Sequence, residues 1–164
     1  MEAGEFDEFY TASFDRLVGQ LYAMTGDREE AQECVQEAFV RAWSHRRQLD
    51  RGRAPEAWVR TTAYRLAVSR WRRTVRGRRD PDRSVQVPRE AAAVGPDHVA
   101  VVQALQQIPE AQRRAVVLHH LCDLPVAAIA AETGVAEGTV KARLSRGRTA
   151  LMALLDDGTG MTEG

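Results

Sequence analysis

A run of basic and hydrogen-bonding side chains near the end of the chain is of a kind that reads the edges of DNA bases. It lies in residues 126–155, after a short apolar segment and a turn at Gly134. A helix, a glycine-containing turn and a basic amphipathic helix follow one another in helix-turn-helix proteins, where the second helix enters a major groove. Arginine can bond guanine, glutamate can accept from cytosine, and threonine can pack on the thymine methyl group. The candidate contacts are Glu137, Thr139, Lys141, Arg143, Arg146 and Arg148, of which the last two are better placed for phosphates. The alternative is a solvated basic surface.

A second cationic segment lies in the middle of the chain, where residues 46–89 contain 14 arginines and four acidic residues. Contacts between such side chains and phosphates give an affinity that falls with salt. Trp58, Tyr64 and Trp71 are interleaved with the arginines, where they could stack on unpaired bases. The alternative for both tryptophans is that they anchor a hydrophobic core. The loop from Leu49 to Pro55 could instead form a pocket for a flipped-out base.

Acidic side chains form a ridge in the first part of the chain. The overall net charge is zero, yet residues 1–45 carry −7 and residues 46–89 carry +10. Glu30, Glu33 and Glu37 recur at steps of three and four, which places like charges together on one side of a helix. A solvated surface and a docking surface for a basic or polar protein both fit this pattern. Two surfaces of opposite charge predict two kinds of partner.

Sequence signatures of enzymes, metal sites and membrane proteins do not occur. The chain contains no GxSxG, Walker or GxGxxG motif and no HExxH spacing. Cys34 and Cys122 form no CxxC pair, so each is expected to be a buried thiol rather than part of a zinc site or a disulfide. No apolar run approaches the ~18 residues of a membrane helix. The acidic start MEAGEFDEFY is unlike a signal peptide. We therefore expect a cytoplasmic protein with no catalytic activity of its own, no metal, no cofactor and no membrane insertion.

Helices must position the charged side chains in the first half, because apolar residues recur there at helical spacing. The expected helices cover residues 6–24, 27–43 and 55–76, with a loop over residues 44–55. Gly26 ends the first helix, Asp27 is the N-cap of the second, and Pro55 suits the first turn of the third. The expected apolar side of the third helix contains Val59, Ala63, Leu66 and Ala67. Another side contains Arg65, Ser69, Arg72 and Arg76.

A second helical domain is expected after a linker. Residues 77–96 contain three prolines, two glycines and no periodicity, which is typical of a flexible connection. Asp97 is the expected N-cap of the next helix, and Pro109 separates that helix from another. The predicted fold class is all-α, with two small helical domains over residues 1–76 and 97–157. Residues 158–164 are expected to be a tail.

Two long strings resemble the sigma-70 family of transcription initiation factors. GDREEAQECVQEAFVRAW, followed by a basic loop and AWVRTTAYRLAVSRWRR, is similar to region 2 of that family. IPEAQRRAVVLHHLCDLPVAAIAAETGVAEGTVKARLSRGRTAL is similar to region 4. The shortness of the chain, with nothing else between the two, resembles the extracytoplasmic-function (ECF) group. The resemblance covers residues from about Phe6 to Leu155.

The resemblance implies a role for each charged segment. The helix over residues 27–43 would dock on the β′ clamp helices of core RNA polymerase, through Asp27, Glu30, Glu33, Gln36 and Glu37. Residues from Leu49 onward would melt and read the promoter −10 element, through Arg51, Arg53, Arg60, Tyr64, Arg65, Ser69, Arg72, Arg73 and Arg76. The last helix would read the −35 element through the six residues named first. Region 4 would also contact the β flap, and an anti-sigma factor is an expected partner.

Several positions depart from the family pattern. Arg65 stands where asparagine is common and Ser69 where aspartate is common, so no −10 consensus can be transferred. Gln32 and Glu33 replace the usual glutamate and aspartate. Ala136 replaces a capping serine, which costs the last helix about 1 kcal/mol.

Three hypotheses follow from these patterns. A sigma factor would bind one promoter at two elements while core polymerase makes the RNA. A stand-alone helix-turn-helix regulator would bind DNA tightly without polymerase, as a dimer on a palindrome, although no dimerisation heptads are visible. A protein-interaction module would bind polymerase or an anti-sigma factor only. Transcription with core polymerase separates the three.

Overall fold

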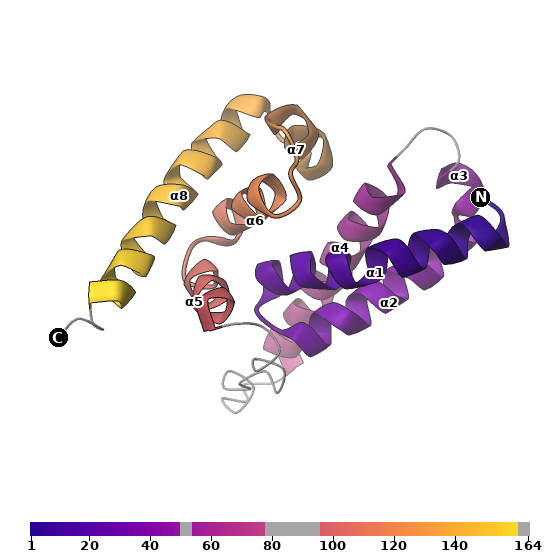
Figure 1. Cartoon of the computed structure of the whole chain (residues 1–164), viewed down its shortest axis with the longest axis horizontal. Coiled ribbons are helices and arrows are strands. Elements are labelled where there is room, and N and C mark those ends of the chain that lie inside the picture. Colours follow the sequence, from indigo (N-terminus) through magenta and orange to yellow (C-terminus); the bar gives the residue numbers. More distant parts are fainter. Residues whose placement is uncertain (50–53, 78–95, 161–164) are drawn as a thin grey trace. The chain divides into compact units, whose positions relative to one another are not determined.

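The computed structural model describes residues 1–49, 54–77 and 96–160, and the described residues are helical throughout apart from short turns. The chain divides into two compact units, Met1–Arg89 and Glu90–Gly164. The first contains α1 (Ala3–Thr25), α2 (Arg28–Ser44), α3 (Arg46–Leu49) and α4 (Pro55–Gly77); the second contains α5 (Pro96–Leu105), α6 (Glu110–His120), α7 (Val126–Thr133) and α8 (Glu137–Gly160) (Figure 1). The all-α class is confirmed. The predicted linker lies mostly outside the described residues.

The first unit is a bundle in which α2 packs against both α1 and α4. The helix boundaries follow the predicted caps. Gly26 ends α1 in the left-handed conformation, at φ 78°, and the Asp27 side chain accepts a hydrogen bond from the Glu30 N–H at 3.0 Å. Pro55 begins α4. The core contains Leu17, Leu21, Val35 and Val59, each at most 1% exposed.

An aromatic cluster closes one end of this bundle. Phe39 of α2 is 2% exposed, and its ring lies 6.2, 5.4, 4.9 and 6.1 Å, between centroids, from those of Phe6, Phe9, Tyr10 and Phe14 of α1. The edge-on arrangement of several of these rings is the favoured geometry for aromatic pairs. The cluster therefore joins the first half of α1 to the middle of α2.

In the second unit, α8 packs against α5, α6 and α7. Gly134 ends α7 at φ 72°, which is the turn predicted between the two helices. Val140 and Leu144 of α8 are buried, and so are Leu105, Val116 and Ile129 from the other three helices. Gly147 lets α8 approach α6 closely, because a Cβ atom there would lie 2.8 Å from Cγ2 of Val116.

Some structural expectations were wrong. The predicted loop contains the short helix α3, whose Leu49 is buried beside α2. Asp97 lies inside the first turn of α5, because the helix begins at Pro96. The tail was predicted to begin at residue 158, but α8 continues to Gly160.

Two large apolar side chains, Trp71 and Leu121, are also exposed, and for Trp71 this removes the alternative of a core anchor. Trp71 is 65% exposed, because it lies past the last buried residues of α4, Leu66 and Ala67. Leu121 is 40% exposed, because α6 ends at His120.

Candidate nucleic-acid and partner interfaces

The exposed side of α8 carries most of the residues expected to contact DNA. Glu137, Thr139, Lys141, Arg146 and Arg148 are exposed, and Arg143 is half-buried. The opposite side is held in the core by Val140, Leu144 and Gly147. The buried side thus fixes which residues face outward. The helix begins without a side-chain oxygen at Ala136, whose carbonyl accepts from the N–H groups of Thr139 and Val140.

Arg148 is engaged within the unit. Its Nε donates to Nε2 of His120 at 3.0 Å, and Arg148 also lines a pocket of about 400 Å³. The pocket is lined by His119, Val126, Lys141, Leu144, Ser145, Arg148 and Thr149. Burial, followed by the nearby Arg148 and His119, lowers the pKa of His120. His120 is therefore held in the neutral form that can accept the bond, and Arg148 is oriented by α6.

The outer side of α4 carries the exposed arginines of the middle segment. Arg65, Arg72 and Arg73 are exposed, whereas Tyr64 and Ser69 are half-buried. Nη2 of Arg73 donates to Oγ of Ser69 at 3.3 Å. Arg65, Ser69 and Arg72 share one side of the helix, as their spacing predicted. Arg51 and Arg53 lie outside the described residues, and so does the side chain of Arg76.

Arg60 differs from the other predicted contacts of α4. It is only 5% exposed, and its Nη1 donates to Oε1 of Gln20 on α1 at 3.3 Å. A buried guanidinium needs such internal partners, because an uncompensated buried charge is costly. Arg60 therefore joins α4 to α1 and does not present its charge to solvent. Sequence reasoning missed this, although Arg60 precedes Ala63 by three residues and Ala67 by seven, which is the spacing of the core-facing row.

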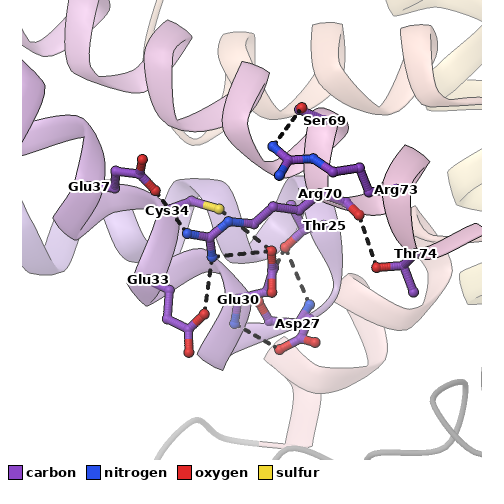
Figure 2. A network of polar contacts seen from close by, with 10 residues as sticks. All are labelled: Thr25, Asp27, Glu30, Glu33, Cys34, Glu37, Ser69, Arg70, Arg73 and Thr74. Atoms are coloured by element: carbon purple, nitrogen blue, oxygen red, sulfur yellow. Dashed lines mark hydrogen bonds and ion pairs between the residues drawn. The ribbon is translucent and has the colours of Figure 1, made fainter. Parts of the chain in front are cut away.

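The acidic ridge of α2 holds an arginine that sequence reasoning missed. Arg70 of α4 inserts between the three carboxylates, as Figure 2 shows. Its Nη1 lies 3.0 Å from Oε2 of Glu33 and 3.5 Å from Oε1 of Glu30, and its Nη2 lies 2.9 Å from Oε2 of Glu37. Arg41 also reaches Oε1 of Glu37 at 3.0 Å. The repulsion expected within the ridge is thus offset by Arg70.

The remaining predicted docking residues have two different environments. The Asp27 carboxylate is exposed but caps α2, and Gln36 is exposed.

Cys34 is fully buried beneath the ridge, with its Sγ 3.7 Å from Oε1 of Glu30. Burial is the main cause that raises the pKa of the Cys34 thiol to about 12. Cys34 therefore stays protonated at neutral pH, in keeping with a structural thiol, whereas Cys122 is half-buried.

Two tryptophans of the first unit are partly covered. Trp43 is 38% exposed, with the Phe6 ring 5.1 Å away and the Arg46 guanidinium 4.1 Å above its ring. Trp58 is half-buried, and its ring lies 5.4 Å from that of His45. Neither is a fully buried core anchor.

Two family models match these two units. Sigma-70 region 2 matches residues 9–77, and sigma-70 region 4 matches residues 98–151. The chain is also 32% identical over 143 residues to the ECF RNA polymerase sigma factor SigL of Mycobacterium tuberculosis, which covers 82% of this chain and 79% of the relative. The chain belongs to the sigma-70 family. It is an RNA polymerase sigma factor that directs promoter recognition and transcription initiation as part of the holoenzyme, and a stand-alone regulator is not favoured.

Other relatives of this sigma factor belong to the ECF group. The ECF RNA polymerase sigma factor SigW of Bacillus subtilis is 27% identical over 158 residues, covering 87% of this chain and 84% of the relative. The sigma factor RpoE of Bartonella quintana, solved in complex with the anti-sigma factor NepR, has a TM-score of 0.79 and 25% identity, covering 93% of this chain and 97% of that one.

The described residues of the sigma factor contain neither a helix that could span a membrane nor a group of side chains that could bind a metal. No helix there combines the length and apolar character needed to cross a membrane. No group of His, Cys, Asp and Glu side chains within 1–49, 54–77 and 96–160 could hold a metal ion.

Proposed function

We propose that α8 reads the −35 element and that α4 reads the −10 element. The observation that carries this assignment is that both helices have one buried apolar side and one exposed cationic side. In each helix, a core-facing row of apolar residues forces a cationic row to face outward. Side chains held in this way lose less conformational entropy on binding. The exposed residues Glu137, Thr139 and Lys141 at the start of α8 are the ones that a helix-turn-helix geometry directs at base edges.

For the −10 element, the proposed contacts are Arg65, Ser69, Arg72 and Arg73, with Tyr64 beside them. Arginines on this side would bind phosphates, and an aromatic ring or a guanidinium plane would stack on bases released from the duplex. The proposed set also includes Arg51, Arg53 and Arg76, on the basis of the sequence alone. Arg60 is proposed to position α4 from within, because it is buried against α1.

For polymerase, the proposed docking surface is α2, facing the β′ clamp helices, with a second contact between the region 4 unit and the β flap. Gln36 and Glu33 are the exposed members of the predicted docking set besides the capping Asp27. Core polymerase would supply the RNA-forming chemistry in the cytoplasm, with no catalytic group from this chain. An anti-sigma factor is proposed as regulator, since the similar Bartonella quintana protein was solved with one.

The assignment is tested by transcription with core polymerase on a library of fragments with random sequence upstream of a reporter. The templates that give transcripts are expected to share two sequence blocks at a fixed spacing. Substituting either block should abolish the transcript. Active templates that share one block only would contradict the two-element assignment.

Arg143→Ala is expected to lose discrimination at one position of the −35 block. A bidentate arginine–guanine contact is worth about 1–3 kcal/mol, so a wild-type preference of roughly 5- to 150-fold should collapse. The measurement compares transcription from each selected promoter and its −35 variants. Arg146→Ala serves as the matched control in the same helix. As a phosphate contact, it should weaken all templates uniformly. If Arg143→Ala keeps the wild-type ranking of −35 sequences, Arg143 does not read a base.

A further inference from the structure

The contact between Arg70 and α2 lies where hydrophobic packing of α4 ends. Up to Ala67, α4 is fixed by buried residues, and its first turns are tied to α1 through Glu56, which pairs with Arg16, and through Arg60. In residues 68–75 no side chain of α4 is buried. Three carboxylates of α2 meet the guanidinium of Arg70 in this stretch, at 2.9 to 3.5 Å.

Arg70 lies on a different side of α4 from Arg65 and Arg72, two of the proposed DNA contacts. It follows the buried Leu66 by four residues and the buried Ala67 by three, so it continues the core-facing row. Arg72 and Arg73 point to the exposed sides. Figure 2 shows the Arg70 side chain directed at Glu33 and Glu37, with Arg73 directed elsewhere toward Ser69.

We propose that Arg70 is a positioning residue for −10 recognition. By joining Glu30, Glu33 and Glu37, it fixes the second half of α4 on α2 and thereby holds the outer side of α4 in the orientation that meets DNA. The inference rests on the proposed reading of the −10 element by α4. It assigns the acidic ridge of α2, expected only to meet polymerase, a second role in DNA affinity.

The proposal predicts a change in DNA affinity that is opposite in sign to the one expected from charge alone. Removing carboxylates from a DNA-binding chain ordinarily strengthens binding to the phosphate backbone, because repulsion falls. If the carboxylates hold Arg70 in place, removing them weakens −10 binding although they do not touch DNA. A role confined to stability does not move the affinity of the folded chain measured well below its melting temperature.

The experiment measures binding of the full-length chain to a single-stranded oligonucleotide carrying the −10 block of a promoter selected from the library, over a range of salt concentrations. The variants are Arg70→Gln and the double variant Glu33→Gln/Glu37→Gln. We expect each to weaken binding about 3- to 10-fold with an unchanged salt slope, and their combination to add little, because all three changes break one network. Arg70→Lys, which keeps the charge without the planar fork, should fall between wild type and Arg70→Gln.

Two matched controls make the result specific. Glu29→Gln removes an exposed carboxylate from the same helix and should leave binding equal or slightly tighter. Arg72→Gln removes a proposed phosphate contact and should lower the salt slope by about 0.7, the value for one contact on a single strand. Circular dichroism before each titration verifies that the variants are folded.

Each outcome decides a separate question. Tighter or unchanged binding by Glu33→Gln/Glu37→Gln, or unchanged binding by Arg70→Gln, would overturn the positioning role while the effect of Arg72→Gln upholds the proposed function. A slope lowered by Arg70→Gln as much as by Arg72→Gln would make Arg70 a direct contact, which also overturns it. No binding by wild type, or no effect of Arg72→Gln, would instead overturn the −10 assignment of α4.

Discussion

Gly147→Leu is expected to disrupt the second unit while the first unit stays folded. A Cβ atom at position 147 would lie 2.8 Å from Cγ2 of Val116 and 3.3 Å from the carbonyl oxygen of Gln112. Val116 is buried and β-branched, so its side chain has few alternative rotamers, and the backbone of α6 must move instead. Overpacking of this kind costs about 3 kcal/mol or more. Leucine is a good helix former, so helix propensity does not account for the loss.

The measurement uses the placement of the tryptophans. Trp43, Trp58 and Trp71 all belong to the first unit, so their fluorescence follows that unit alone, whereas circular dichroism follows both. In Gly147→Leu the midpoint temperature of the transition seen only by circular dichroism should fall by at least about 12 °C, at roughly 4 °C per kcal/mol for a unit of this size. Transcription from −35-dependent promoters should be lost with it.

Gly138→Ala is the matched control for position 147. Gly138 lies in the same helix, but a Cβ atom there would meet nothing within 4 Å. Its replacement should stabilise the unit by up to about 1 kcal/mol, because alanine loses less backbone entropy. A Gly147→Leu chain with an unchanged transition would show that α8 does not approach α6 as closely as described.

Phe39→Ala is expected to destabilise the first unit by about 3–5 kcal/mol. Phe39 contacts four aromatic rings of α1 and is 2% exposed, so its truncation removes buried area and leaves a cavity between α1 and α2. A unit of this size is stable by only about 4–13 kcal/mol. The loss therefore approaches the whole stability at physiological temperature, and the amount of active sigma factor should fall.

Denaturant unfolding followed by tryptophan fluorescence measures this loss directly. The midpoint should fall in Phe39→Ala, and the transition of the second unit, seen by circular dichroism, should stay in place. Val40→Ala is the neighbouring control, since Val40 is 69% exposed and its truncation should shift the midpoint little. Equal shifts for Phe39→Ala and Val40→Ala would contradict the aromatic cluster.

Local signals in the sequence predicted the parts of this fold that depend on nearby residues. The cap at Asp27 and the glycine turns at Gly26 and Gly134 each need only a few neighbours along the chain, and each is confirmed. For the same reason the helix-turn-helix segment could be recognised from residues 126–155 alone.

Tertiary contacts decided the features that sequence reasoning missed. Arg70 looked like one of many arginines, and only the packing of α4 on α2 brings it to Glu30, Glu33 and Glu37. Arg60 was grouped with surface arginines because nothing local indicates Gln20, 40 residues earlier. The exposure of Trp71 likewise depends on where the bundle ends. The available signal for Arg70 was that it continues the apolar row of α4, a position that calls for an internal anionic partner.

The most direct test of the account is run-off transcription by purified core RNA polymerase with and without the full-length chain, on the promoter library. The account predicts that the chain co-purifies with core polymerase and that discrete transcripts start downstream of paired −10 and −35 blocks only when it is present. A chain that does not associate with core polymerase, or that leaves the transcripts of every template unchanged, would contradict it.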